Sequence, residues 1–394
     1  MSDTRKTTKP NVPNLRFPGF EGEWENKRIG DIGKFFSGGT PSSSRKDFYG
    51  GEIPFIRSGE IHSDKTELFL TQEGYKNSSA KMVEVGDILL ALYGANSGDI
   101  SISQMRGAIN QAILCIRTNV APVFFKSVWE KHAQKILNTY LQGGQGNLSA
   151  DIVKKITISI PSQIEQAKIA ALFSHLDERI SIQNRLIDRL QSLIKGINRT
   201  IFTGSGLEYS LCDVCEIRSG YSGNQLQGGK GLGVSRIETI SAHNINLERI
   251  GYVAPFDASE NYRLQVGDIL FSNINSVEYI GNTAFIDKDY NLYHGMNLLR
   301  LIPFRNVVVP FYLYILLNTN RMLKHFKTIC NKAVSQASIN QKELGKTIVM
   351  LPSLEKQKQV CNIYQAMYSK LKTEKDVLSF YQEQKRYLLR HMFI

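Results

Sequence analysis

Residues 156–202 read ITISIPSQIEQAKIAALFSHLDERISIQNRLIDRLQSLIKGINRTIF, and residues 347–393 read TIVMLPSLEKQKQVCNIYQAMYSKLKTEKDVLSFYQEQKRYLLRHMF. The two stretches belong to one repeat, residues 148–203 and 339–394, with a constant offset of 191 positions. Each copy begins with an alternating apolar run that ends in Pro-Ser, and about forty residues with helical periodicity follow. The chain therefore contains two long helices of one design.

Apolar residues in these helices recur at alternating steps of four and three, the a/d spacing of a coiled coil. The first seam is Ile169, Phe173, Leu176, Ile180, Gln183, Ile187, Leu190, Ile194, Ile197 and Ile201. The second seam is Val360, Tyr364, Met367, Leu371, Glu374, Leu378, Tyr381, Lys385, Leu388 and Met392. We expect these residues to form the core between the helices, so that their function is spacing.

The connection between the helices predicts their direction. The first helix ends where the second globular segment begins, and the second helix starts where that segment ends. Both junctions then lie at one end of the molecule, so the helices should run antiparallel. The 39 residues from Glu165 to Thr203 would extend about 58 Å. We predict two globular domains held apart by this pair, related by a pseudo-twofold axis.

The globular segments repeat more loosely than the helices. The sequence Val-Gly-Asp-Ile-Leu at residues 85–89 returns at 266–270, and Ser37-Gly38 returns as Ser219-Gly220. Because the offsets drift, the globular segments contain insertions and the helices do not. Divergent globular domains on constant helices are typical of variable recognition on a fixed frame.

Both globular segments contain short apolar runs separated by Gly, Ser, Asn and Pro, together with one longer amphipathic stretch. This pattern predicts an α+β fold with two mixed α/β domains. Strands are expected at 53–56, 87–92, 112–116, 156–160, 234–237, 268–272 and 298–302, and helices at 124–141 and 310–330. The expected boundaries are a disordered tail 1–14, domains 15–161 and 205–352, and spacer helices 162–204 and 353–394.

The composition limits the class of protein. The formal net charge is +12, which favours a polyanionic partner. No run of eighteen apolar residues occurs, so we expect no membrane span. Five scattered cysteines suit a reducing cytoplasm. Cys212 and Cys215 form a C-x-x-C, but no second pair of ligands accompanies them, so a zinc or redox site is disfavoured.

Several short motifs follow one another along the chain: PNLRFPGF at 13–20 with Trp24, SGGTP at 37–41, GEIPFI at 51–56, the two VGDIL segments, INQ at 109–111 and PSQIEQ at 161–166. Their order resembles that in the specificity subunits of type I restriction-modification systems. Each motif is short, but their order and the two long helices cover the chain after the tail. The second globular segment departs from the pattern, because Ser-Gly-Tyr-Ser-Gly stands at 219–223.

The resemblance implies two target-recognition domains, each reading one half of a bipartite DNA target, and helices that set the spacing. It also implies docking of two methyltransferase subunits, and of restriction subunits in the complete complex. The chain has no Asn/Asp-Pro-Pro-aromatic loop, no phosphate-binding G-x-x-x-x-G-K-[ST] and no H-E-x-x-H. We therefore expect a non-catalytic chain without a cofactor, with S-adenosylmethionine, ATP and Mg²⁺ bound only by partner subunits.

Base readout needs polar donors and acceptors at the groove, and affinity needs cations along the phosphates. Residues of these types gather in the loops of both globular domains. In the first domain the DNA-binding candidates are Ser37, Gly38, Gly39, Thr40, Ser42, Arg45, Lys46, Arg57, Tyr93, Asn96, Asn110 and Gln111. In the second they are Ser219, Tyr221, Asn224, Lys230, Arg236, Asn273, Asn275, His294 and Asn297.

Two other functions remain open at this point. The chain could be a coiled-coil adaptor that scaffolds only proteins, or a modification enzyme that acts alone. The basic charge and the polar, glycine-rich loops favour DNA recognition over the adaptor. For the Asn and Ser candidates, a role as turn formers is the competing interpretation.

Overall fold

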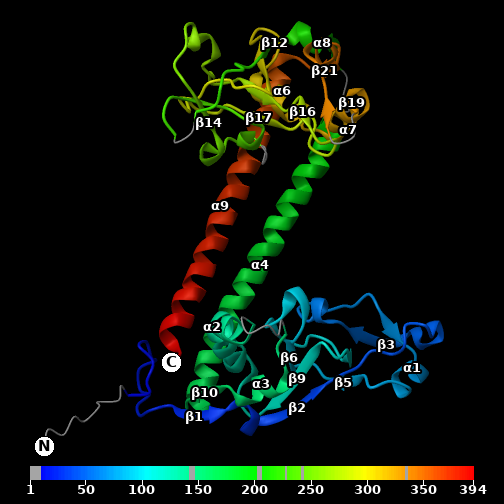
Figure 1. Cartoon of the computed structure of the whole chain (residues 1–394), viewed down its shortest axis with the longest axis vertical. Coiled ribbons are helices and arrows are strands. Elements are labelled where there is room, and N and C mark those ends of the chain that lie inside the picture. Colours follow the sequence, from blue (N-terminus) through cyan, green and yellow to red (C-terminus); the bar gives the residue numbers. More distant parts are fainter. Residues whose placement is uncertain (1–9, 142–146, 202–205, 227–228, 241–243, 333–335) are drawn as a thin grey trace, which may run out of the picture. The chain divides into compact units, whose positions relative to one another are not determined.

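The computed structural model of the chain describes residues 10–141, 147–201, 206–226, 229–240, 244–332 and 336–394 (Figure 1). The chain forms two compact units. Unit 1 comprises Met1–Arg185 and Lys375–Ile394, and unit 2 comprises Leu186–Glu374. Both long helices, α4 (Gln163–Ile201) and α9 (Leu354–Met392), therefore contribute one segment to each unit.

Unit 1 is built on a four-stranded antiparallel sheet in the order β2-β9-β6-β7. A second sheet, β4-β3-β8-β5, contains one parallel pair, β3 with β8. The remaining strands of the unit, β1 and β10, pair with each other. The strands are β1 (Glu25–Arg28), β2 (Gly33–Ser37), β3 (Tyr49–Ile56), β4 (Phe69–Leu70), β5 (Lys81–Val83), β6 (Ile88–Ala91), β7 (Ile100–Ile102), β8 (Gly107–Ile109), β9 (Ile113–Thr118) and β10 (Thr157–Ile160). The helices before α4 are α1 (Gln72–Lys76), α2 (Pro122–Leu141) and α3 (Ala150–Lys155).

Unit 2 repeats the first sheet of unit 1. Its strand order is β12-β18-β15-β17. In both sheets the strand that comes last in the sequence, β9 or β18, lies between the first strand and the second. Smaller sheets replace the mixed second sheet of unit 1. The strands are β11 (Leu207–Ser210), β12 (Cys215–Ser219), β13 (Leu232–Val234), β14 (Gly251–Val253), β15 (Ile269–Phe271), β16 (Ile274–Asn275), β17 (Thr283–Phe285), β18 (Leu299–Pro303), β19 (Asn331–Lys332), β20 (Ala337–Ser338) and β21 (Ile348–Leu351). The helices before α9 are α5 (Leu211–Val214), α6 (Pro310–Leu317), α7 (Asn320–Ile329) and α8 (Gln341–Gly345).

The repeated Val-Gly-Asp segments form the turns that lead into β6 and β15. Asp87 and Asp268 each accept a hydrogen bond from a backbone N–H three residues earlier, as expected of turn residues. Each carboxylate also pairs with an arginine of the neighbouring strand, Asp87 with Arg117 at 2.6 Å and Asp268 with Arg300 at 2.6 Å. The repeat is therefore preserved in contacts as well as in sequence.

A buried glutamine fixes the first turn of each long helix to its own globular unit. Gln166 accepts a hydrogen bond from the Ala121 N–H at the start of α2 and donates to the Pro161 carbonyl. Gln357 makes the equivalent bonds to the Val309 N–H and the Pro352 carbonyl. Each helix thus begins in a fixed position relative to the sheet before it.

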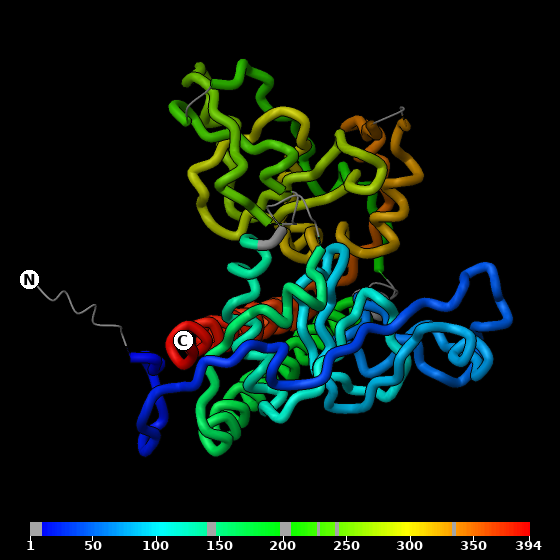
Figure 2. The backbone as a smooth tube through the Cα atoms, turned by 60° about the horizontal axis from the view of Figure 1, so that its bottom comes forward, coloured from blue at the N-terminus to red at the C-terminus, as the bar shows by residue number. Residues whose placement is uncertain are grey.

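Within unit 1, α4 and α9 run in opposite directions. Phe173 contacts Phe393 with ring centroids 5.3 Å apart, Asp177 pairs with Lys385 at 2.7 Å, and Arg179 lies 5.9 Å from the Tyr381 ring. As α4 advances, its partners move backward along α9. Consistent with these contacts, both ends of the chain's described part meet in this unit, where the Leu15 N–H donates to the His391 carbonyl (Figure 2).

Every seam residue whose side chain is described is buried or half-buried; the side chain of Ile201 lies outside the described residues. Ile169, Phe173, Ile187, Ile194 and Tyr364 are among the most enclosed, with at most 7% of their surface exposed. The apolar stripe thus faces inward along both helices. Knobs-into-holes packing and the separation of the two units by the helices stay predictions.

Several sequence-based expectations need correction. The helix expected at 310–330 is two helices, because the Thr319 side chain caps a new helix by accepting from the Met322 N–H. The strand expected at 234–237 overlaps the observed β13 (Leu232–Val234) only at Val234, and a 3₁₀ turn, η5 (Ile237–Ile240), follows. At the start of α4, Ser162 Oγ accepts a hydrogen bond from the Glu165 N–H, while the Glu165 carboxylate pairs with Arg16.

The chain is already attached to unit 1 at Asn11, within the tail expected at 1–14. Asn11 donates to the Trp24 carbonyl and to Asn26 Oδ1, while its own carbonyl accepts from the Trp24 N–H. These contacts attach the chain to unit 1 from Asn11 onward. Residues 1–9 lie outside the described residues. Within the part of the chain that the structure describes, no helix has the length and apolar character needed to cross a membrane.

Candidate nucleic-acid interface

The glycine loop after β2 lies against the residues that follow β8. A Cβ added at Gly38 would come 1.7 Å from the Ile109 carbonyl oxygen, so only glycine fits there. The Gly39 N–H donates to the same carbonyl at 3.3 Å. Thr40 Oγ1 then donates to Gln111 Oε1 at 2.6 Å. Two segments that the sequence separates by about seventy residues therefore form one site.

The parallel pair β3 and β8 brings a third segment to this place. Ile56 pairs with Ile109, so both strands end at the same edge of the sheet. The Asn110 N–H donates to the Ile56 carbonyl, and Arg57 continues from β3 into the 3₁₀ turn η3 (Ser58–Glu60). A Cβ at Gly59 would lie 3.6 Å from Asn96 Nδ2, which adds the turn η4 (Gly94–Asn96). We define the unit 1 loop surface as residues 37–42, 57–60, 94–96 and 110–111.

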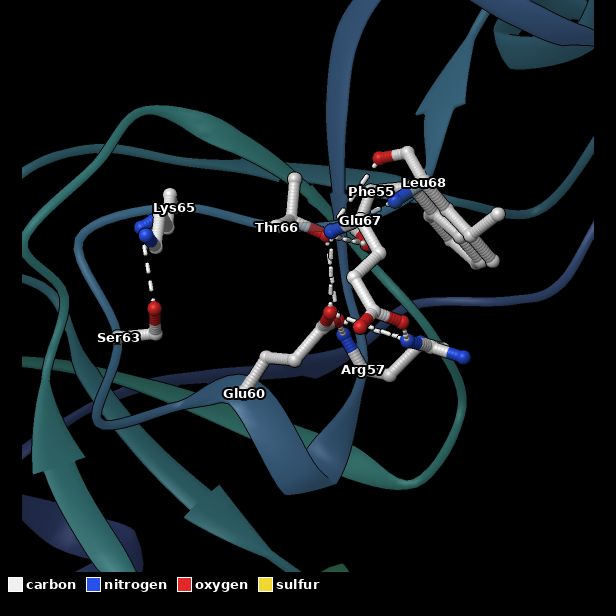
Figure 3. Close-up of polar contacts among 8 residues, drawn as sticks. All are labelled: Phe55, Arg57, Glu60, Ser63, Lys65, Thr66, Glu67 and Leu68. Atoms are coloured by element: carbon white, nitrogen blue, oxygen red, sulfur yellow. Dashed lines mark hydrogen bonds and ion pairs between the residues drawn. The ribbon is translucent and has the colours of Figure 1, made fainter. Parts of the chain in front are cut away.

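Arg57 is held by two carboxylates on this surface (Figure 3). Its Nε and Nη2 donate to Glu60 at 3.2 and 3.0 Å, and Nη2 also donates to Glu67 at 3.0 Å. Burial opposes ionisation of Glu60, but hydrogen bonds from Arg57 and from the Glu67 N–H lower its pKa to about 2. The carboxylate of Glu60 is therefore ionised at neutral pH.

The other candidates in unit 1 lie at or beside this surface. Tyr93 is 39% exposed and precedes η4, while Asn110 Oδ1 accepts from the Ala112 N–H and so also serves a turn. Arg45 pairs with Asp47 and lies over the Phe48 ring. Three further predicted residues have exposed or half-buried side chains on these loops: Ser37, Ser42 and Lys46.

Unit 2 builds a second surface on the same backbone plan. A Cβ at Gly220 would come 1.8 Å from the Gly295 carbonyl oxygen, and the Tyr221 N–H donates to the His294 carbonyl. Residues 233–235 run parallel to residues 293–295 through a bridge between Val234 and Tyr293. Arg236 follows this pair. We define the unit 2 loop surface as residues 219–222, 236–239 and 293–297.

The assignment of His294 to DNA contact is wrong. Its side chain is 1% exposed, and its Nε2 lies 3.0 Å from the Leu298 carbonyl. Burial lowers the pKa of His294 to about 4, so the ring is neutral at physiological pH. His294 therefore stabilises the loop from inside the unit.

Asn273 and Asn275 belong to a different part of unit 2. Asn273 Nδ2 donates to the Ile339 carbonyl, and Asn275 lies in β16, which pairs with β20. Asn297 adopts a left-handed conformation with φ of 65°, as expected of a turn former. Ser219 and Arg236 lie on the loop surface, and Asn224 follows its first segment by two residues. The side chains of these three candidates and of Lys230 are exposed.

The sequence did not single out several residues that shape these surfaces. In unit 2 the missed residues are Phe256 and Tyr262. The predicted Tyr221 stacks on Phe256, with ring centroids 3.6 Å apart, and meets Tyr262 edge-on. These rings line a cleft of about 650 Å³ together with Ser219 and Arg218. In unit 1, Glu60 and Glu67 were missed, although the three-residue spacing from Arg57 to Glu60 is a usable signal for a cap.

Among the described residues, Cys212 and Cys215 have no neighbours that would complete a metal site. Cys212 is exposed, whereas Cys215 is buried and its burial raises the pKa of its thiol to about 12. Over the described ranges of the chain, no three His, Cys, Asp or Glu side chains come together in a way that would hold a metal ion.

Comparisons with known proteins identify the family. The chain matches the family described as type I restriction modification DNA specificity domain twice, over residues 21–192 and 207–379. It is 38% identical over 187 residues to the MjaX specificity subunit of Methanocaldococcus jannaschii, a match covering 46% of this chain and 44% of that protein. The MjaVIII specificity subunit of the same organism is 24% identical over 398 residues, 92% of this chain and 88% of that protein.

The HindI specificity subunit of Haemophilus influenzae is 28% identical over 187 residues, 43% of this chain and 40% of that protein. Its match, like that of the MjaX subunit, spans less than half of the relative's length. A solved specificity subunit from M. genitalium has a TM-score of 0.64 at 16% identity, covering 97% of this chain and 99% of that one.

A second solved structure, described for complex assembly and conformational transition of the type I R-M system, has a TM-score of 0.56 at 18% identity and covers 96% and 98% of the two chains. At these identities the likeness of the two structures shows the fold. Since the family's domain matches both halves of the sequence, this chain belongs to the type I restriction-modification DNA specificity family.

Proposed function

We propose that this chain is the non-catalytic DNA-recognition subunit of a type I restriction-modification complex. Each globular unit reads one half of a bipartite duplex target. One observation carries the proposal: Gly38 and Gly220 place equivalent loops against parallel-paired segments, but the side chains on the two surfaces differ. A common backbone with different polar groups suits two readers of different half-sites.

The proposed partners are supported by the family and by the chemistry of the chain. Two methyltransferase subunits, and restriction subunits in the complete complex, supply the reactions in the cytoplasm. S-adenosylmethionine, ATP and Mg²⁺ bind to those subunits. This division of labour is supported by the absence of methyltransferase and nucleotide-binding motifs from the sequence and by the names of the relatives as specificity subunits.

Exchange of one globular unit tests whether each unit recognises its half-site independently of the other. The segment 15–161 is replaced by that of a relative with another target, and methylated motifs are mapped in cells that express the full chain with its methyltransferase. One half-site should change, and the other half-site and the spacer should stay the same. Methylation without any partner subunit, or a change in both half-sites, would contradict the proposal.

Salt dependence separates DNA recognition from a protein-only adaptor. Binding of the full complex to duplex DNA should weaken linearly on a log–log plot against salt, with a slope of about −0.9 for each neutralised phosphate. The control is a duplex with both half-sites scrambled, which reports non-specific binding. An adaptor would show no preference for the intact target at any salt concentration.

A further inference from the structure

Arg57 and Arg236 occupy equivalent places in the two units. Each follows a segment that is paired in parallel, and each precedes a 3₁₀ turn, η3 or η5. The backbone N–H of each arginine donates to the side chain three residues later, Arg57 to Glu60 at 3.1 Å and Arg236 to Thr239 at 2.9 Å. The fold thus presents one arginine at the same position of each loop surface.

The two arginines differ in how firmly they are held. Glu60 caps the backbone of Arg57 and also binds its guanidinium through two hydrogen bonds. Thr239, its counterpart, has no carboxylate with which to do so. Arg236 instead forms an ion pair with Glu238 at 3.6 Å. The Arg57 guanidinium is therefore held by hydrogen bonds of 3.0 and 3.2 Å to Glu60, whereas the Arg236 guanidinium has the longer ion pair with Glu238.

The charges around Arg57 favour a base over a phosphate. Glu60 and Glu67 place two carboxylates against one guanidinium. In the free chain a phosphate approaching this cluster would meet a net negative charge, and once Glu67 has moved away the remaining Arg57–Glu60 pair has no net charge to attract it. A base edge carries no formal charge, so its approach avoids that cost. Phosphate contacts are better served by cations outside this cluster, such as the exposed Lys46.

The hydrogen-bonding edges of Arg57 indicate which base. Glu60 occupies the Nε–Nη2 edge and is 15% exposed, while Glu67 reaches only Nη2 and is 84% exposed. For Nη1, the described residues provide no hydrogen-bond partner. Displacement of Glu67 would open the terminal Nη1–Nη2 edge. That edge matches the O6 and N7 acceptors of guanine in the major groove.

We propose that Arg57 is a specificity-determining residue that reads a guanine within one half-site, with Glu60 as the positioning residue. Glu67 occupies the reading edge in the free chain and leaves it when the target binds. This inference rests on the proposed function, because it assigns one contact within the first half-site. It goes further by separating base readout at Arg57 from phosphate contact.

Selection from random duplexes tests the role of Arg57. The full chain with its methyltransferase subunits binds a pool of duplex DNA with both half-sites randomised, and the bound fraction is sequenced. The wild type should enrich a guanine at one position, and Arg57→Ala should reduce that preference about 10- to 100-fold. All other positions should keep their preferences. The matched control, Arg236→Ala, should leave the preference at this position intact.

A conservative variant protects the test against misfolding. Arg57→Lys keeps the charge but loses the planar fork. It should lose the guanine preference while the salt slope stays within the error of the wild type. Uniform weakening of all sequences in Arg57→Ala, with a salt slope smaller by about one phosphate, would overturn the inference in favour of a phosphate contact.

The carboxylates give an independent readout. Glu60→Gln should weaken the guanine preference several-fold, because the guanidinium loses its fixed orientation. Glu67→Gln should keep the preference and tighten binding, since the competing carboxylate is gone. Equal effects of the two substitutions would overturn the assigned roles. If the wild-type complex enriches no sequence at either half-site, the proposed function itself fails, and that result differs from all of these.

Discussion

The places where each globular unit meets the long helices have the same backbone plan and different chemistry. In unit 1, Lys126 and Glu130 of α2 form a closed ionic cluster with Asp177 of α4 and Lys385 of α9, through four contacts of 2.7 to 2.8 Å. At the repeat position of Asp177, unit 2 has Tyr368. The joint of unit 1 is therefore ionic at a position where that of unit 2 is aromatic.

Beneath these differences the buried rings correspond. Phe173 of unit 1 and Tyr364 of unit 2 occupy repeat positions 191 residues apart, and neither has any exposed surface. The clamping glutamines, Gln166 and Gln357, also correspond and are buried. The comparison teaches that the contacts that orient the helix are kept, whereas the residues around them diverge as long as they stay paired or packed.

Removal of a buried ring should have the largest effect. Phe173→Ala should lower the free energy of unfolding of unit 1 by about 3–5 kcal/mol, because it removes buried surface and leaves a cavity. Both tryptophans of the chain, Trp24 and Trp129, are buried in unit 1. Their emission during urea titration therefore reports this unit selectively.

The matched substitution in unit 2 decides whether the units are independent. Tyr364→Ala should move the tryptophan transition much less than Phe173→Ala, since the affected core lies in unit 2. If both variants moved it equally, the two joints would belong to one cooperative structure and the comparison would fail.

Loss of the glutamine clamp should have an intermediate effect. Gln166→Leu keeps most of the volume but leaves the Ala121 N–H and the Pro161 carbonyl without their partner, which should cost about 1–3 kcal/mol. Gln357→Leu should cost a similar amount in unit 2, measured by amide hydrogen exchange across α6 and β21. If the loss of hydrogen-exchange protection differed more than tenfold between Gln166→Leu and Gln357→Leu, the two glutamine clamps would not be equivalent.

The ionic cluster should have the smallest effect, and one that depends on pH. Burial opposes ionisation of Asp177, but Lys126 and Lys385 lower its pKa below the ordinary value. A carboxyl with a lowered pKa stabilises the fold above its unfolded pKa of about 3.9, and that contribution is lost as pH falls. Asp177→Asn should therefore flatten the loss of stability as pH falls below about 5, at a cost of about 1 kcal/mol at neutral pH.

The urea midpoint of tryptophan emission, followed against pH, measures this effect. Tyr368→Phe at the repeat position in unit 2 is the control and should leave the pH profile of unit 1 as in the wild type. A profile of Asp177→Asn identical to that of the wild type would show that the cluster adds no stability to unit 1.

Local periodicity predicted the parts of the fold that depend on neighbouring residues. The helix expected at 124–141 is α2, which begins two residues earlier. The strands expected at 87–92 and 298–302 are β6 and β18, with each end shifted by one residue. These features depend on contacts within a few residues, which the sequence displays directly.

Which residues meet at the loop surfaces depends on contacts between segments that are distant in the sequence. The sequence proposed Arg57, Thr40 and Gln111 as separate candidates, but only the parallel pairing of β3 with β8 brings their segments to one edge. Histidine is a residue type that often binds ligands, and the burial of His294 could not be inferred from its neighbours in the sequence. Whether a polar side chain is a reader or an internal support is set by packing.

By itself, the sequence determined the internal repeat, the two long helices with their inward apolar stripe, and the polar loops as candidates for recognition. A helical period and a repeat at a constant offset are properties of the order of residues along the chain, so they can be found in the sequence without a structure. The tertiary structure decided which arginine is held by carboxylates, which histidine is buried and how each helix is clamped. Those outcomes depend on side chains that meet only after distant strands have paired.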